Sequence, residues 1–193
     1  LLRNVWKEDM SSRRLPAGSS ANKKDFQLVR DMGMRETGIL VSCSDYHIFY
    51  KMKMTRKQAM EHYLSIVKEC LEIGVSVRCH LEDITRADIY GYVIPFCLEL
   101  MKLRQQYGIP IKVRCCDTMG YGVNYPGAVI PRSVPGIIYG IMVHAGVPSE
   151  LIEWHGHNDF YKAVSNSTTA WLYGLRRQYF FVWYRRAYRK YTS

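Results

Sequence analysis

Short apolar runs and amphipathic stretches alternate along the chain from about residue 24 to residue 173. Apolar positions recur at helical spacing in the amphipathic stretches, whereas the short runs are rich in β-branched residues, so the pattern predicts alternating helices and strands. The predicted strands are Thr37 to Cys43, Val75 to Leu81, Ile111 to Asp117 and Leu151 to His157. The predicted helices are Lys24 to Met32, Thr55 to Ile73, Arg86 to Tyr107, Arg132 to Ala145 and Asp159 to Tyr173.

A repeated strand-helix unit of this kind predicts an α/β protein with a parallel sheet. Gly33, Gly74, Gly108 and Gly146 each follow a predicted helix, as helix-terminating glycines do. About four consecutive units fit either a doubly wound sheet or a partial (β/α)8 barrel, and periodicity does not separate the two. In both architectures chemistry collects at the C-terminal ends of the strands, so the polar residues there are the functional candidates.

Composition indicates one globular domain with a real core, because the chain has 193 residues and is 48% hydrophobic. No apolar run is long enough to span a membrane, and charges interrupt the first residues where a signal peptide would be apolar. These features predict a cytoplasmic protein without membrane contact. The six cysteines lack metal-ribbon spacing and are predicted to be reduced core thiols.

The net charge of +10 is concentrated at the ends of the chain. Residues 175–193 carry six basic side chains and no acid, and residues 1–20 carry four bases against two acids. The region between them therefore carries 10 − 8 = +2, which is ordinary for a soluble enzyme. A basic, aromatic tail can bind nucleic acid. Nucleic acid is therefore considered as a partner for the tail only.

The last predicted strand carries two histidines that can chelate one metal ion. Glu153, His155 and His157 project to the same side of a strand, while Trp154 points outward. Asn158 and Asp159 beside them add oxygen ligands, and a set of histidines and oxygens with open positions suits an exchangeable divalent cation. The alternative is a pair of hydrogen-bonded loop histidines.

A second alternating set, Arg78, His80 and Glu82, lies on the second predicted strand. The guanidinium can clamp a substrate carboxylate and the carboxylate can act as a base, although an internal salt bridge between Arg78 and Glu82 is the simpler alternative. Thr118 is either a hydrogen-bond donor to substrate or a helix cap. His47 lies at the same predicted edge, either in the pocket or as an ordinary satisfied polar group.

Four stretches of the sequence together resemble a known enzyme family. They are SCSDYHIFYKMKMTRKQAM, RCHLEDITRADIYGYVIPF, CDTMGYG and EWHGHNDFYKAVSNSTTAWLYG. Residues 21–174 are similar to the central part of the TIM-barrel family of 2-isopropylmalate synthases, homocitrate synthases, Re-citrate synthases and hydroxymethylglutaryl-CoA lyases, with the Re-citrate synthases most alike.

The resemblance implies a pocket and a reaction. It implies that His155 and His157 bind a divalent ion (Mg, Mn or similar), that Arg78 and Thr118 hold a 2-oxo acid, and that Glu82 and His47 are catalytic. His80, where relatives often have serine, and Glu153 would line the substrate site. The implied reaction is a Claisen condensation of acetyl-CoA with the 2-oxo acid. Oxaloacetate, giving citrate, is favoured over 2-oxoglutarate and 2-oxoisovalerate. Full-length relatives are expected to be homodimers.

Two family motifs are missing from the flanks. The Arg-Asp pair of the first strand has no counterpart before residue 21, and the motif Gly-x-Gly-Glu-Arg-x-Gly-Asn does not follow Gly174. Codons chosen for residues 183–192 spell that motif when read from the second base. We therefore hypothesise that residues 1–20 and 175–193 are out-of-frame translation around a genuine fragment, which by itself is expected to be inactive. An uninterrupted frame encoding this tail in independent isolates would contradict the hypothesis.

The alternative from another functional class is a non-catalytic half barrel. Its basic aromatic tail would bind nucleic acid, or two copies would associate to close the cylinder. The frame hypothesis accounts for the tail without a nucleic-acid partner, so nucleic acid is the less favoured expectation.

Overall fold

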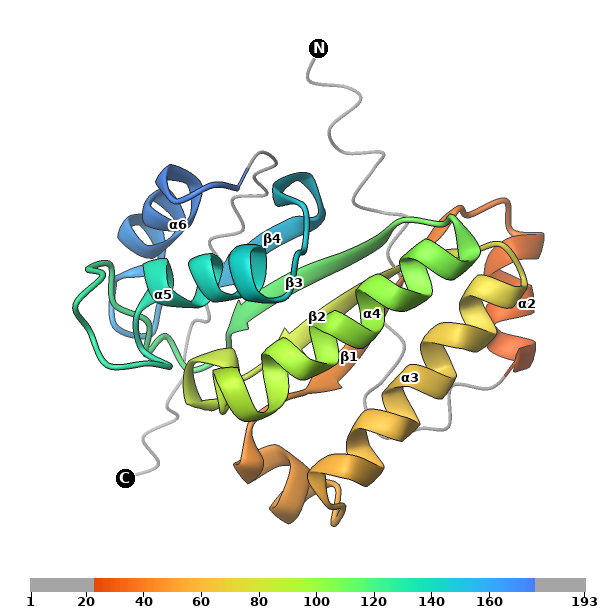
Figure 1. Ribbon diagram of the computed structural model, residues 1–193, viewed down its shortest axis with the longest axis horizontal. Helices are drawn as coiled ribbons and strands as arrows, with labels where there is room; N and C mark the ends of the chain where they lie inside the picture. Colours follow the sequence, from red (N-terminus) through yellow and green to blue (C-terminus); the bar gives the residue numbers. More distant parts are fainter. Residues whose placement is uncertain (1–22, 176–193) are drawn as a thin grey trace, which may run out of the picture.

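A four-stranded parallel sheet forms the centre of the protein in the computed structural model, which describes residues 23–175. The strands are β1 (Glu36–Ser42), β2 (Ser76–Glu82), β3 (Ile111–Asp117) and β4 (Ile152–Gly156). The helices are α2 (Lys23–Asp31), α3 (Arg56–Glu72), α4 (Ile94–Tyr107), α5 (Val134–Tyr139) and α6 (Ala163–Leu172). Helices α3, α4 and α5 lie on one face of the sheet (Figure 1).

Each strand pairs in parallel with the next strand along the chain, in the order β1-β2-β3-β4. A doubly wound sheet would reverse its strand order and place helices on both faces. Sequential order with helices on one face is instead the arrangement of consecutive units in a (β/α)8 barrel. Within the described residues, β1 and β4 each pair along only one edge. The opposite face of the sheet corresponds to the inside of a barrel.

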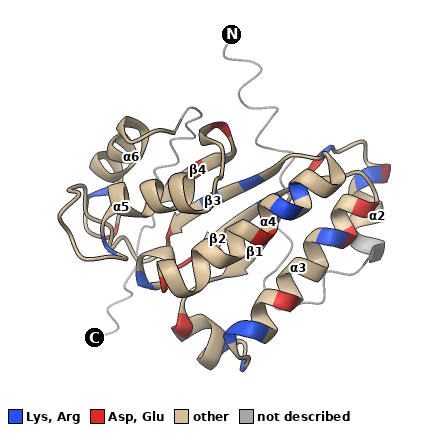
Figure 2. Ribbon diagram, in the orientation of Figure 1, with Lys and Arg blue, Asp and Glu red and all other residues tan. Residues whose placement is uncertain are grey.

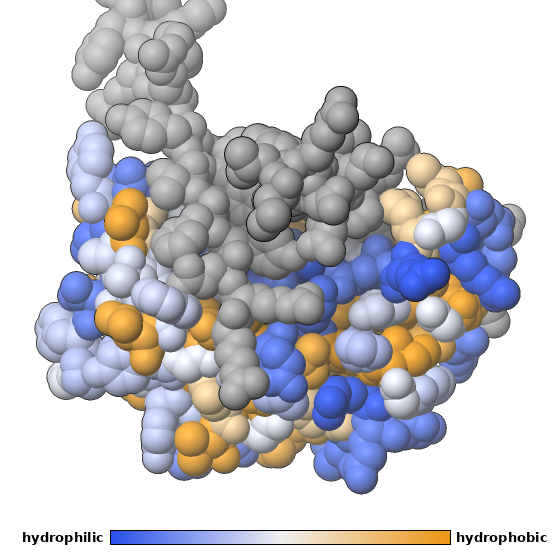
Figure 3. All heavy atoms as spheres, turned by 90° about the horizontal axis from the view of Figure 1, so that it is seen from above, coloured by the Kyte–Doolittle hydropathy of each residue, from blue (hydrophilic) through white to orange (hydrophobic). Residues whose placement is uncertain are grey.

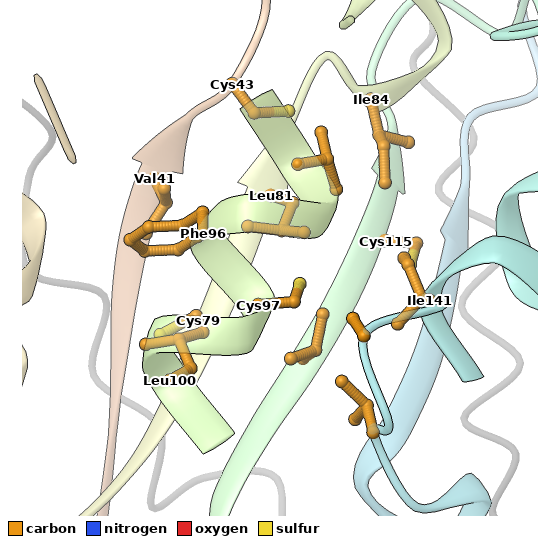
Figure 4. Packing of buried hydrophobic residues seen from close by; sticks show 14 of the residues in the cluster. Val41, Cys43, Cys79, Leu81, Ile84, Phe96, Cys97, Leu100, Cys115 and Ile141 are labelled. Carbon is orange, nitrogen blue, oxygen red and sulfur yellow. The ribbon is translucent and has the colours of Figure 1, made fainter. Parts of the chain in front are cut away.

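The hydrophobic core lies between the sheet and its helices (Figure 4). Cys79 and Leu81 of β2 point toward α4, where Phe96 and Leu100 face them. All six cysteines are free and buried, and five of them lie in the hydrophobic core as predicted, whereas Cys116 lies on the opposite face of the sheet. Burial raises the pKa of Cys97 to about 12, so this thiol stays protonated at neutral pH.

Local sequence explains where α3 and α4 begin and end. Thr55 and Gln58 form a reciprocal capping box at the start of α3. Gly108, with φ of +66°, ends α4 in the left-handed conformation that glycine adopts readily. Both ends predicted for α3 and the end predicted for α4 therefore agree with the structure to within one residue.

Three predicted helices are shorter than expected. The chain after β2 forms a 3₁₀ turn η2 (Ile84–Arg86) and a π-helical turn η3 (Ile89–Val93) before α4 begins, since the Asp88 side chain caps Gly91. Likewise α5 passes into the π-helical turn η4 (Gly140–His144). Helix α6 starts after Tyr161, whose φ of +59° is incompatible with a right-handed helix.

The charged surface of the described residues carries both signs. Figure 2 shows lysines, arginines and acids interspersed along α3 and α4, whereas α5 and α6 have no charged residue. On the visible face in Figure 3, hydrophobic residues lie in several places with hydrophilic residues between them. In the described part of the chain, no helix has the length and apolarity needed to cross a membrane. The basic tail predicted as a nucleic-acid contact lies outside the described residues, as does the segment 1–20.

Candidate active site

The inner face of the sheet carries three levels of side chains, set by the strand register. The lowest level holds Gly38, Arg78 and Lys112, and the middle level holds Leu40, His80, Arg114 and Glu153. The upper level, nearest the C-terminal ends of the strands, holds Ser42, Glu82, Cys116 and His155. Because side chains alternate along a strand, the intervening residues face the helices. Polar and charged groups thus dominate a face that is buried in complete barrels.

An ion-pair network joins the lower two levels. Glu153 accepts from Arg78 Nε at 3.1 Å and from Arg114 Nε at 2.7 Å. Glu36 in turn contacts Arg78 Nη2 and Lys112 Nζ, each at 2.6 Å. Positive and negative side chains therefore alternate along the chain of contacts Lys112–Glu36–Arg78–Glu153–Arg114, which draws on all four strands. The predicted alternative pairing of Arg78 with Glu82 is absent among these contacts, because Arg78 reaches toward the start of β1 instead.

His80 lies above Gly38 on the neighbouring strand. A Cβ placed on Gly38 would come within 3.1 Å of His80 Nε2. The imidazole therefore occupies the space that a side chain at position 38 would take. His80 is buried and belongs to the inner face, as the sequence predicted, but it leans toward the lower level of the sheet.

The two histidines predicted as metal ligands lie together at the end of β4. Their ring centroids are 5.1 Å apart, with the ring planes tilted by 47°. The strand ends at Gly156, and His157 is held to the end of β3 by its backbone N–H, which donates to Asp117 O at 3.3 Å. Asn158 does not face the pair with its oxygen, because its Oδ1 accepts from Ala163 N at the start of α6.

The loop after β3 is fixed by the buried carboxylate of Asp117. Asp117 accepts from Thr85 Oγ1 at 2.8 Å and from the backbone N–H groups of Tyr121 and Gly122 at 2.9 and 3.0 Å. Burial raises the pKa of Asp117, and these hydrogen bonds act in the opposite direction. Asn166 of α6 donates to Gly122 O at 2.9 Å. The loop that follows Thr118 is therefore tied both to β3 and to α6.

Thr118, Glu82 and His47 lie at the upper edge of the sheet around Asp83, which contacts Thr118 and His47 and follows Glu82 in the chain. The backbone N–H of Asp83 donates to Thr118 Oγ1 at 2.8 Å, and its carboxylate lies 3.9 Å from His47 Nε2. Burial lowers the pKa of His47, and the Asp83 charge partly offsets this effect. Glu82 Oε2 lies 3.9 Å from Lys51 Nζ, on the same π-helical turn, η1 (Tyr46–Lys51), that carries His47.

The predicted site residues thus fall into two groups. Glu82, Thr118, His47, His155 and His157 lie at the C-terminal ends of the strands, whereas Arg78, His80 and Glu153 lie deeper on the inner face. Thr118 is six residues beyond the β3 position that pairs with Arg78, roughly 20 Å of strand. Arg78 contacts Glu36 and Glu153, whereas Thr118 contacts Asp83, so the two residues predicted to hold the 2-oxo acid take part in different sets of contacts.

Several residues of this region were not predicted from the sequence. Lys112 and Arg114 alternate on β3 just as Arg78 and His80 do on β2, so the same period-2 pattern contained the signal. Ser44, Asp83 and Arg86 form contacts between different strand ends, and no local pattern indicates such contacts. Among the described residues, no group of three or more His, Cys, Asp or Glu side chains is arranged to hold a metal ion.

The fold is part of a TIM barrel whose inner face and C-terminal strand ends carry polar and charged residues. The HMGL-like family model matches residues 1–178, so the chain belongs to this family, and the family predicted from the sequence motifs is confirmed.

Known proteins of the family share substantial identity with the chain. Over 154 residues it is 63% identical to the citrate (Re)-synthase of Clostridium kluyveri, and this alignment covers 80% of this chain and 34% of that protein. It is 61% identical to the citrate (Re)-synthase of Syntrophus aciditrophicus, covering 80% of this chain and 24% of the relative. The chain therefore spans about a third or less of the length of these relatives.

Solved structures confirm the fold. The hydroxymethylglutaryl-CoA lyase of Pseudomonas aeruginosa matches with a TM-score of 0.63 and 21% identity over 80% of this chain and 49% of that one. The Bacillus subtilis HMG-CoA lyase matches with a TM-score of 0.59 and 18% identity over 86% of this chain and 51% of that one. The prediction of a partial (β/α)8 barrel is thereby confirmed.

Proposed function

We propose that the protein to which this chain belongs is a divalent-metal-dependent acyltransferase that condenses acetyl-CoA with a 2-oxo acid. Oxaloacetate is the favoured acid and citrate the product, because two relatives above 60% identity are citrate (Re)-synthases. The observation that carries the proposal is the pairing of His155 and His157 beside the strand ends that bear Thr118 and Glu82. These four residues come from three adjacent strands or the loops that follow them.

The donor set fits a divalent ion such as Mg²⁺ or Mn²⁺. Two imidazole rings 5.1 Å apart on the same side of a strand end can bind one ion and leave its other positions to water and substrate oxygens. When bound, the ion polarises the carbonyl group of the 2-oxo acid. Since the described residues offer no third clustered ligand, His155 and His157 are the protein ligands that we assign.

Thr118 is suited to donate a hydrogen bond to the 2-oxo acid. Its Oγ1 already accepts the Asp83 N–H, and its hydroxyl hydrogen is directed at Cys116 O across a long 3.4 Å contact. A substrate oxygen can replace that weak partner at little cost. Arg78 can bind a substrate carboxylate only if its guanidinium turns from Glu36 toward the strand ends; Glu153 and His80 then line the path beside it.

Glu82 and His47 are the proposed acid-base groups. Burial lowers the pKa of His47, so its imidazole is largely neutral near pH 7 and can accept a proton. In the condensation, a base removes a proton from the methyl group of acetyl-CoA, and the resulting carbanion attacks the carbonyl carbon of the acid. Hydrolysis of the thioester then releases free CoA thiol and the hydroxy diacid or triacid.

Thiol release is the assay that tests this function. The longest polypeptide encoded around this sequence at its locus is incubated with acetyl-CoA, Mn²⁺ and either oxaloacetate, 2-oxoglutarate or 2-oxoisovalerate. We expect release with oxaloacetate, and we expect His155→Ala to abolish it while His62→Ala, on the outer helix α3, leaves it unchanged. No release with any of the three acids, although Mn²⁺ is bound, would exclude the proposed reaction.

A further inference from the structure

Asp83 is a fully buried residue in an uncommon backbone conformation. It follows β2 directly, its relative exposure is 0%, and its φ and ψ are +64° and +37°. Non-glycine residues seldom adopt this left-handed region, although aspartate and asparagine tolerate it better than most. Of the three described non-glycine residues with positive φ, Lys53 and Tyr161 are exposed and only Asp83 is buried.

Asp83 joins the ends of three strands through both its backbone and its side chain. Its N–H leaves the sheet ladder and donates to Thr118 Oγ1 beyond β3. Its carboxylate accepts from the Ser44 hydroxyl beyond β1 at 2.5 Å and from Arg86 Nε at 2.8 and 2.9 Å. The same carboxylate lies 3.9 Å from His47 Nε2. A single residue therefore touches two of the groups assigned above to substrate binding and proton transfer.

We propose that Asp83 is a positioning residue that fixes Thr118 and His47 relative to each other at the C-terminal ends of β1, β2 and β3. The left-handed turn directs the amide toward Thr118 while the carboxylate remains on the opposite side toward Ser44 and His47. A residue with an extended backbone would continue the strand, and its amide and carboxylate could not reach Thr118 and Ser44 at the same time. This inference rests on the proposed function for the roles of Thr118 and His47, whereas the contacts themselves do not.

Accepting the Asp83 N–H also orients the hydroxyl of Thr118. With Oγ1 already occupied as an acceptor, the hydroxyl hydrogen must point elsewhere, toward Cys116 O or an incoming oxygen. The residue thereby makes Thr118 a donor on the side of the strand ends. Strained backbone conformations of this kind cost about 1–3 kcal/mol and persist where surrounding contacts hold them.

A purely structural role for Asp83 would be to anchor the turn η2 through Arg86 and Ser44. Such an anchor would change stability but not the titration of His47. The two roles are separated by Asp83→Asn, because asparagine tolerates the left-handed conformation and can still accept from Ser44 while lacking the charge. The matched control is Asp88→Asn, which also removes a carboxylate that binds an arginine and keeps the cap on Gly91.

The titration of His47 is measured by NMR on the complete 193-residue chain, with His47→Gln to assign its signal. The charged groups that face His47 are Asp83 and Glu82, which raise its pKa, and Lys51 and Arg86, which lower it. Loss of the Asp83 charge is expected to lower the pKa of His47 further, because this charge raises it. Asp88→Asn should leave the pKa in place. An Asp83→Asn chain that folds with an unchanged His47 titration would overturn the proposal.

Arg86→Gln supplies a test of opposite sign that does not alter the strained residue. Removing this cation is expected to raise the pKa of His47, because Arg86 lowers it and otherwise neutralises Asp83. If Asp83→Asn fails to fold, this shift alone decides, and an unchanged or lowered pKa would overturn the charge coupling between Asp83 and His47.

Amide hydrogen exchange tests the contact with Thr118. Thr118→Val removes the acceptor and is expected to speed exchange of the Asp83 N–H at least tenfold, while Thr118→Ser keeps the acceptor and the protection. Equal exchange in both variants would overturn the contact. None of these measurements uses acetyl-CoA, so a full-length protein without condensing activity would refute the proposed function while leaving the linkage of Thr118, Asp83 and His47 intact.

Discussion

Replacing Glu153 by glutamine is expected to destabilise the described domain strongly. The Glu153 carboxylate is 2% exposed and holds Arg114, 6% exposed, and Arg78, 7% exposed. Removing its charge leaves Arg114 in the interior without the carboxylate to which its Nε donates. Breaking a buried ion pair from one side costs about 3–5 kcal/mol, and because glutamine keeps the shape and one acceptor oxygen, we expect a loss of about 3 kcal/mol.

Urea unfolding measures this loss directly. For a slope of about 2 kcal/mol per molar, the midpoint should fall by about 1.5 M. Glu150→Gln is the matched control, since Glu150 is exposed at the 3₁₀ turn before β4 and should change stability by less than about 0.5 kcal/mol. In a chain that already carries Arg114→Met, the same Glu153→Gln change should cost at least about 1 kcal/mol less, because its partner is gone.

Two results would refute this account of the network. A midpoint that moves by less than about 0.3 M on Glu153→Gln would mean that the inner-face charges are well hydrated in solution. Additive effects of Glu153→Gln and Arg114→Met would mean that the two side chains do not interact energetically, whatever their separation.

Three further predictions concern the loop after β3, the turn η1 and the histidine pair. Gly122→Ala should destabilise by about 2 kcal/mol in urea unfolding, because its Cβ would approach a buried carboxylate oxygen to 2.8 Å, whereas Gly127→Ala, with open space around it, should be neutral. The pKa of His47 in the folded state lies below the unfolded value of 6.5, so the folded state loses stability as pH falls below that value and the imidazole is protonated. Because glutamine does not titrate, His47→Gln should lose less stability than the unchanged chain between about pH 7 and pH 5, as measured by thermal unfolding. His155→Ala and His157→Ala should each weaken Mn²⁺ binding by roughly tenfold or more in calorimetry, and variants that both bind Mn²⁺ as tightly as the unchanged chain would exclude the pair as ligands.

Element types and order could be predicted because the apolar pattern is strong. The strand predicted at Ile111 to Asp117 is observed with the same bounds, and six of its seven residues are buried. Helix starts were less predictable where tertiary contacts decide them. The segment after β2 has helical periodicity from Arg86, but side-chain caps and a left-handed residue delay the regular helix until Ile94.

The direction of long side chains could not be predicted from alternation. Period 2 placed Arg78 on the inner face, but its position along the barrel axis depends on Glu36, which lies on a different strand. The conformation of Asp83 could not be predicted from the sequence either, because its hydrogen-bond partners lie beyond β1 and β3. The proximity of His155 and His157 could be predicted from the sequence, because both residues lie at the end of one strand and are separated by one residue.

The contact between Gly38 and His80 has an evolutionary consequence. An imidazole that occupies the space above a glycine on the next strand makes the two positions interdependent, since a Cβ at position 38 would meet its ring at 3.1 Å. Homologues with a smaller residue at position 80 are free to carry alanine or serine at position 38. The two positions should therefore covary across the family, because a Cβ at position 38 requires the ring at position 80 to shift or to be replaced by a smaller side chain.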